Sequence, residues 1–174
     1  MKIKLIKSSF HEGTERNDCV IWEELNKKLI FTELEAESCE DVLDQVGGAL
    51  IKEGYCKDTY KEALKIREAE YPTGLDIDGI GVAIPHTDVS HVEKQGIAIA
   101  VLKNPVTFVQ MGTEDETAEI KLVFMLAVKE PKTQIDRLQA ILSIIQDKET
   151  LKKLLEVRDT EEIIEIIKEK ESLS

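Results

Sequence analysis

Apolar residues recur along this chain with two different periods, and the period changes from one segment to the next. Short apolar or alternating runs between turn residues predict strands over residues 28–34, 81–84, 97–102, 106–109 and 120–128. Apolar residues spaced three and four apart predict helices over residues 42–51, 60–67, 135–145, 151–155 and 163–167. This alternation predicts an α/β fold in which helices cover a mixed sheet.

Cap and breaker residues set the expected limits of these segments. Ser38 and Asp58 stand where the first two helices should be capped, and Asp159 precedes the last helix. Residues 75–79 are expected to form a loop, and Asn104-Pro105 a turn between two strands.

The first 27 residues fit the pattern poorly. Residues 2–7 alternate as a strand would, so we expect residues 1–27 to form an N-terminal arm or an extra strand. The chain contains no internal repeat and no linker composition, and we therefore expect a single domain over residues 28–174.

The net charge of the chain limits the classes of macromolecule that it can bind. The chain of 174 residues carries 23 Lys and Arg against 35 Asp and Glu, a net charge of -12. Nucleic acids and anionic membrane surfaces attract basic proteins, so neither is expected to bind here. A partner protein with a basic face remains compatible with this charge.

Other compositional features favour a cytoplasmic protein. The longest apolar runs, residues 97–102 and 122–128, are too short to span a bilayer, and residues 1–10 lack the apolar core of a signal peptide. Cys19, Cys39 and Cys56 have no CxxC spacing, so they are expected to be reduced thiols.

The candidate chemistry lies in the segment from Gly79 to Asp88. Residues 81–84 predict a short buried strand, which Pro85 should end because proline cannot donate to a sheet ladder. His86 would then stand at the mouth of the sheet, where it is both held and accessible. An imidazole there can act as a nucleophile and carry a phosphoryl group. The alternative is a structural histidine whose ring is satisfied by the backbone.

A set of spaced motifs surrounds this histidine. The segments are Arg67-Glu68, Tyr71-Pro72-Thr73-Gly74-Leu75, Gly81-Val82-Ala83-Ile84-Pro85-His86, Pro105-Val106-x-Phe108 and Leu122-Val123-Phe124-Met125-Leu126, followed by a helix from Gln134. Together they resemble the mannitol/fructose class of enzyme IIA, from the bacterial phosphoenolpyruvate-dependent sugar phosphotransferase system. The resemblance covers about residues 28–170. The segment from Tyr71 to Leu75, taken together with His86-Thr87-Asp88, makes it look closest to the galactitol branch. It implies a mixed five-stranded sheet with helices on both faces.

The resemblance also implies an activity. His86 would accept a phosphoryl group from the phosphocarrier HPr and pass it to an enzyme IIB. The chain would thereby serve, indirectly, the membrane transporter IIC, whose incoming sugar or polyol, such as galactitol, is then phosphorylated. The accepting atom would be Nε2, with Nδ1 bound to the backbone. No cofactor is implied. The alternative is a regulatory IIA-like protein, which senses phosphorylation state and binds partner proteins.

Three further residues take supporting roles through the motif match. Arg67 would clamp the phosphoryl oxygens, since a guanidinium suits the charge of such a transfer. Thr73 would donate its hydroxyl to the phosphoryl group, and Glu68 would orient Arg67. The alternative for Arg67 is a solvated residue at a helix end.

This chain also departs from the family pattern. Gln134 stands where mannitol and fructose members have a second histidine, and an amide cannot carry positive charge. Gln134 would donate a hydrogen bond or simply begin the helix. The spacing from Arg67 to His86 is a few residues longer than in mannitol members, with the extra length in residues 75–79.

A metal site is not expected. His86, Asp88 and His91 lie close together in sequence, but their spacing matches no standard zinc pattern. His91 is expected to be an exposed loop residue or a supporting partner of His86.

Overall fold

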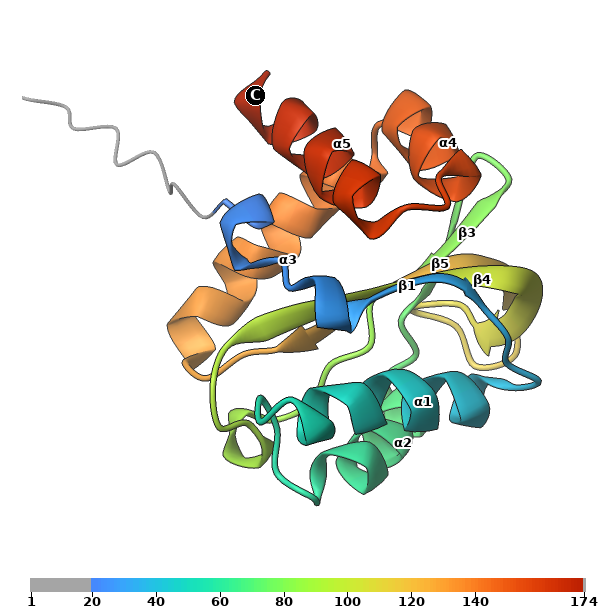
Figure 1. Ribbon diagram of the computed structural model, residues 1–174. Coiled ribbons are helices and arrows are strands. Elements are labelled where there is room, and N and C mark those ends of the chain that lie inside the picture. The colour runs from blue at the N-terminus through green and yellow to red at the C-terminus, as the bar shows by residue number, and fades with distance from the viewer. Residues whose placement is uncertain (1–19, 174) are drawn as a thin grey trace, which may run out of the picture.

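The computed structural model describes residues 20–173, which form a five-stranded sheet between two layers of helices (Figure 1). The strands are β1 (Ile30–Leu34), β2 (Gly74–Ile77), β3 (Ile80–Ala83), β4 (Gly96–Val109) and β5 (Thr117–Ala127). Their order across the sheet is β1-β4-β5-β3-β2. The prediction of a mixed five-stranded sheet is confirmed.

Strand directions explain why the sheet is mixed. β5 lies in the centre, antiparallel to β4 on one side and parallel to β3 on the other. β1 runs parallel to β4, and β2 forms an antiparallel hairpin with β3. The prediction that the most apolar run forms a central strand is therefore correct, because a strand covered on both faces needs apolar residues throughout.

Five helices cover the sheet on both faces, as expected (Figure 1). They are α1 (Cys39–Lys52), α2 (Tyr60–Glu70), α3 (Pro131–Ile145), α4 (Lys148–Glu156) and α5 (Thr160–Ser172). One apolar cluster packs α1 and α2 against the sheet, and a second packs α3, α4 and α5 against the opposite face. Short 3-10 turns occur at Trp22–Glu24, Lys27–Leu29 and Val89–His91.

Two of the three predicted helix caps are correct. The Ser38 hydroxyl accepts a hydrogen bond from the N–H of Asp41, and Asp159 accepts one from Glu161. The expectation for Asp58 is wrong by one residue. Thr59 occupies the N-cap of α2, without a capping hydrogen bond from its side chain.

Two predicted connections are also wrong. Residues 75–79 were expected to be a loop, but Gly74–Ile77 is an edge strand and the turn is confined to Asp78 and Gly79, with φ of 51° and 91°. Asp76 fixes this turn by accepting a hydrogen bond from the N–H of Gly79 at 2.7 Å. Asn104-Pro105, expected as a turn, lies within the single long strand β4, where the pairing with β5 shifts register.

The segment before β1 packs closely on the last helix. Ile21 is fully buried, and the backbone N–H groups of Ile21 and Trp22 donate to the Glu171 carboxylate of α5 at 2.8 and 2.9 Å. Glu24 forms a two-pronged ion pair with Arg137 of α3, whose side chain is almost completely buried. Residues 1–19 of the expected arm lie outside the described residues, and the boundary at residue 28 stays a prediction.

Over the described part of the chain, no helix is both long and apolar enough to cross a membrane. Cys39 is half-buried and Cys56 is buried, and both are free thiols. Burial raises the pKa of each to about 12. Cys19 lies outside the described residues.

Candidate functional site

His86 stands just beyond the end of β3, where the sequence places it. The Pro85 carbonyl accepts a hydrogen bond from the N–H of Leu126 at 3.0 Å, and His86 forms an isolated bridge with Leu126 of β5. The chain is thus still attached to the sheet at the residue that carries the ring. Pro85 has no N–H of its own to donate, and it takes part in this pairing only through its carbonyl.

The ring of His86 is held by its own backbone. Nδ1 lies 2.8 Å from the carbonyl oxygen of Ile84, and a carbonyl can only accept, so Nδ1 carries the proton. In the neutral ring the lone pair therefore belongs to Nε2. The side chain is half-buried, so the ring is fixed but not enclosed.

The surroundings keep this imidazole neutral. Burial lowers the pKa of His86 below its ordinary value of 6.5, the Ile84 carbonyl opposes this, and the Arg67 cation lowers the pKa further. A neutral imidazole with a free Nε2 is the nucleophilic form.

Tyr60 connects α2 to the strand next to the site. Its hydroxyl donates to the carbonyl oxygen of Leu126 at 2.6 Å, and the side chain is fully buried. Burial raises the pKa of Tyr60 well above its usual value, so the hydroxyl stays protonated and remains a donor. Sequence reasoning assigned Tyr60 only to a helix, because its partner lies 66 residues away.

Arg67 lies in the last turn of α2, exposed to solvent, with its guanidinium carbon 4.3 Å from the centre of the Tyr71 ring. It borders a cavity of about 400 Å³ beside the His86 loop, whose lining comprises Thr59, Glu62, Ala63, Ile66, Arg67, Glu70, Thr87 and His91. Thr87, the residue after His86, lines the same cavity, so Arg67 lies on the side of α2 that faces the His86 loop.

Glu68 and Thr73 form a buried pair. The backbone N–H of Thr73 donates to Glu68 Oε1 at 2.8 Å, and the Thr73 hydroxyl donates to Oε2 at 2.8 Å. Burial raises the pKa of Glu68, although these two hydrogen bonds act in the opposite direction. The pair fixes the segment between α2 and β2, and the single hydroxyl proton of Thr73 is directed at Glu68.

Gln134 is the fourth residue of α3 and is half-buried. Within residues 20–173, no hydrogen bond joins its side chain to His86, Arg67, Glu68 or Thr73. The start of α3 is held instead through Thr133, whose hydroxyl lies 3.2 Å from the Gln95 side chain. The structure thus brings four of the five predicted site residues together around the β3 end and α2.

His91 and Asp88 shape the loop after His86. Asp88 accepts a hydrogen bond from the N–H of Ser90, and this bond lowers the pKa of its carboxyl. His91 Nδ1 lies 2.8 Å from the Thr59 hydroxyl, so His91 is a half-buried wall of the cavity rather than a freely exposed residue. Among the described residues, no group of three or more His, Cys, Asp or Glu side chains could hold a metal ion.

The family described as "Phosphoenolpyruvate-dependent sugar phosphotransferase system, EIIA 2" matches residues 23–170. The chain belongs to this family. The match spans both layers of helices and all five strands, and it confirms the resemblance to a type 2 enzyme IIA.

Individual relatives show the range of proteins that carry this EIIA domain. The galactitol-specific EIIA component of Escherichia coli K12 is 30% identical over 121 residues, 70% of this chain and 80% of that protein. Transcriptional regulator ManR of Bacillus subtilis is 35% identical over 120 residues, 68% of this chain but 17% of that protein. The complex of the E. coli mannitol enzymes IIA and phosphorylated IIB contains a chain with a TM-score of 0.69 and 23% identity, at 83% coverage of this chain and 97% of that one. The last similarity establishes the fold.

Proposed function

We propose that this EIIA domain is a phosphocarrier that accepts a phosphoryl group from HPr on Nε2 of His86 and passes it to an enzyme IIB. The observation that carries the proposal is the contact between Nδ1 of His86 and the Ile84 carbonyl, because it leaves Nε2 as the ring's nucleophilic atom. The half-burial of the ring and the lowered pKa support the same role.

The transfer needs no redox partner or metal. The lone pair of Nε2 forms a bond to phosphorus while the bond from phosphorus to the donor breaks, and that electron pair returns to the donor. The second transfer repeats the step with His86 as the leaving group. Throughout both transfers the proton stays on Nδ1, which donates it in a hydrogen bond to the Ile84 carbonyl, so the ring does not have to turn. Catalysis of this kind rests on positioning and charge stabilisation.

Arg67 is proposed to stabilise the transferred group. A dianionic phosphoryl group is unfavourable on a protein of net charge -12 unless a local cation compensates. Arg67 lies at the end of a helix whose other end is fixed by the buried Tyr60, so its backbone position is set even though its side chain is exposed. A guanidinium can then donate two parallel hydrogen bonds to phosphoryl oxygens.

The other predicted residues are proposed to act around this pair. Glu68 and Thr73 hold the chain that leads from Arg67 to the hairpin, and Thr73 would reach a phosphoryl group only if its hydroxyl turned away from Glu68. Gln134, at the start of α3, would donate through its amide to the partner or the phosphoryl group.

The substrate system follows from similarity. The galactitol-specific relative supports a polyol pathway with a IIB and a IIC component downstream, located in the cytoplasm on the IIA side. Incubation with phosphoenolpyruvate, enzyme I and HPr should label the wild-type chain, and the label should move to a galactitol-type IIB. His86→Ala should remain unlabelled under the same conditions. An unlabelled wild-type chain beside labelled HPr would refute the proposal.

The similarity to ManR supports a second function, in which phosphorylation of the same histidine controls binding to a regulatory partner. Pull-down with the phosphorylated and unphosphorylated forms separates the two functions. A cognate IIB that removes the label at a rate comparable to its uptake from HPr excludes a purely regulatory role.

A further inference from the structure

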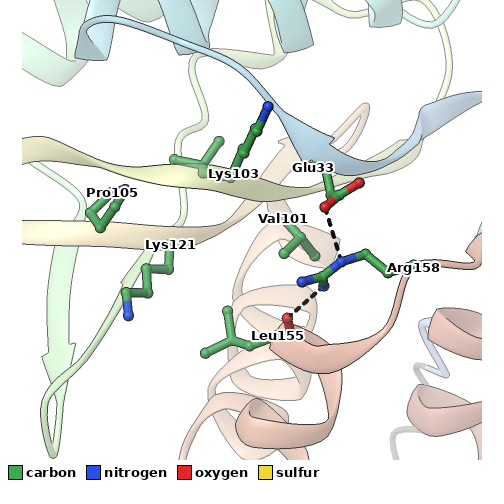
Figure 2. Close-up of a pocket in the computed structure, with 8 residues that line it drawn as sticks. Glu33, Val101, Lys103, Pro105, Lys121, Leu155 and Arg158 are labelled. Carbon is green, nitrogen blue, oxygen red and sulfur yellow. Dashed lines mark hydrogen bonds and ion pairs between the residues drawn. The ribbon is translucent and has the colours of Figure 1, made fainter.

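A second pocket lies where β1, β4 and β5 meet beside the end of α4 (Figure 2). It occupies about 260 Å³ between β1, β4, β5 and the chain that follows α4. Val101, Pro105 and Leu155 give it an apolar floor, and three cations and one carboxylate border it: Lys103, Lys121, Arg158 and Glu33.

Three neighbouring strands lose their regular pairing here. The register shifts between Phe31 and Leu34 in β1, between Val101 and Val106 in β4, and across Lys121 of β5, which has no partner of its own in β3. Glu33 adopts a positive φ of 56° at the same place. Bulges redirect side chains and occur often beside functional sites, and a left-handed non-glycine residue is similarly enriched there. Irregularities in three strands at one place indicate a built feature rather than a local defect.

The bulge in β5 determines where Lys121 points. Ile120 belongs to the apolar cluster under α1 and α2, and Leu122 belongs to the cluster under α3, α4 and α5. The extra residue between them lets Lys121 emerge on the side of the sheet that carries Leu155 and Arg158, away from Lys103 (Figure 2). Without the bulge, residues 121 and 122 would point to opposite faces.

The cations differ in what they already bind. Lys103 turns to the other side of the sheet and pairs with Glu35 at 2.6 Å. Arg158 pairs through Nε with Glu33 at 3.1 Å, and Nη1 donates to the Leu155 carbonyl at the same distance. These contacts orient the guanidinium, and Figure 2 shows its remaining terminal nitrogen turned toward the pocket. Lys121 forms no ion pair with any residue between 20 and 173.

We propose that this pocket binds a small phosphate monoester, with its phosphate between Lys121 and Arg158 and its carbon skeleton on Val101, Pro105 and Leu155. A fixed guanidinium and a mobile ammonium make a phosphate site on an apolar floor. The volume is below the roughly 300–1,000 Å³ of pockets for drug-sized ligands, so the ligand is no larger than a sugar phosphate. Cations on both sides of a pocket in a protein of charge -12 favour a dianion over a neutral sugar.

The pocket is separate from the proposed phosphoryl site. Lys121 and Leu126, which bridges to His86, are five residues apart on β5, or about 17 Å along a strand. The inference therefore does not depend on phosphotransfer by His86. Its test must nevertheless exclude phosphate binding beside Arg67.

The test is a titration of the ¹⁵N-labelled protein with glucose 6-phosphate, with glucose and inorganic phosphate as comparison probes. We expect saturable shifts of the amides around Lys121 and Arg158 in the millimolar range or tighter, no response to glucose, and weaker binding at high salt. Lys121→Glu should weaken binding at least about tenfold, and Arg158→Gln similarly, because each removes a charge-assisted contact. Arg67→Ala should leave this binding unchanged.

Lys152→Glu is the matched control. Lys152 is an exposed residue of α4 outside the pocket, and its replacement changes the net charge as much as Lys121→Glu does. Shifts confined to the neighbourhood of Arg67, an absence of saturation at the pocket, or equal weakening by Lys152→Glu and Lys121→Glu would each overturn the proposal. Lys121→Gln, which adds no negative charge, provides the same comparison if Lys121→Glu unfolds.

Discussion

The hydroxyl of Tyr60 donates a hydrogen bond to the carbonyl oxygen of Leu126, and Leu126 is the residue that pairs with the backbone at His86. A fully buried side chain of α2 thus holds the strand on which the reactive histidine depends. This contact connects the helix that positions Arg67 to the strand end that positions His86.

Tyr60→Phe removes this hydrogen bond while keeping the ring. We expect a loss of about 1 kcal/mol in the free energy of unfolding, since a buried carbonyl loses its donor. Urea unfolding measures the change, and phosphotransfer from HPr should slow as well. Tyr71→Phe is the matched control because Tyr71 is 59% exposed, and it should change stability by less than about 0.5 kcal/mol. Equal effects of the two substitutions would contradict this account of Tyr60.

Arg67→Ala should slow phosphotransfer far more than it lowers stability. The side chain is exposed and stacks only on Tyr71, so the free energy of unfolding should change by less than about 0.5 kcal/mol. The rate should fall roughly tenfold to a hundredfold, because the developing phosphoryl charge loses its cation. Quench-flow labelling from phosphorylated HPr measures it. Arg67→Lys should recover part of the rate, and wild-type rates in Arg67→Ala would remove the residue from the site.

The lowered pKa of His86 predicts how activity and stability depend on pH. Between the lowered folded pKa and the ordinary value of 6.5, the unfolded chain binds more protons than the folded one, so stability falls as pH drops through this window. Phosphotransfer should fall at a lower pH than for a free imidazole, since the ring stays neutral longer. NMR titration of the ring locates the midpoint, and a value at or above 6.5 would contradict the burial argument.

Glu68 should make the stability of the fold depend on pH in the opposite direction. Its pKa is raised by burial, so the folded state holds the proton more tightly and stability falls as pH rises from 4.5 through the raised value. Glu68→Gln should remove this slope while keeping an acceptor for the Thr73 N–H, and the variant should gain stability relative to wild type as pH rises. Urea unfolding of both proteins, measured from pH 4.5, the ordinary pKa of a glutamate, up to pH 8, gives the free energies of unfolding that test this. Parallel curves for the two proteins would refute the prediction.

The ion pair between Glu24 and Arg137 should matter for stability rather than transfer. Arg137 is only 4% exposed and its Nε is already without a partner in the described structure. Glu24→Ala would leave the guanidinium buried and unpaired, at a cost of about 3 kcal/mol. The double variant Glu24→Leu with Arg137→Met should recover most of that loss, because replacing both charges removes the penalty. Thermal unfolding of the single and double variants compares them directly.

The sequence predicted the parts of this structure that depend on local signals. The apolar run of β5, the helical spacing of α3 and the proline before His86 are each readable over a few residues. The edge strand β2 was missed because it is short, half-exposed and interrupted by Asp76, which resembles a loop composition. The passage of β4 through Asn104-Pro105 was missed because a bulge permits a proline that a regular ladder would exclude.

The candidate site likewise contains residues that the sequence predicts and contacts that leave no local sequence signal. His86 and Arg67 were predicted from motifs, but the tie from Tyr60 to Leu126 joins residues 66 positions apart and has no local sequence signal. The engagement of Thr73 with Glu68 was also not foreseen, although the two lie five residues apart, because a buried carboxylate is uncommon. For the contact with Leu126, the sequence offered only a tyrosine, Tyr60, at the start of a predicted helix.

The contact of the segment before β1 with α5 affects how the protein is made. The apolar cluster under α1 and α2 draws on residues 29 to 127, whereas the cluster on the other face draws on residues 21 to 167. Once residue 127 has left the ribosome, every residue of the first cluster is available, while Phe124 and Ile97 on the second face still lack the helices that cover them. The nascent chain therefore presents one uncovered apolar surface until α5 emerges, and this interval is when it most needs protection from aggregation.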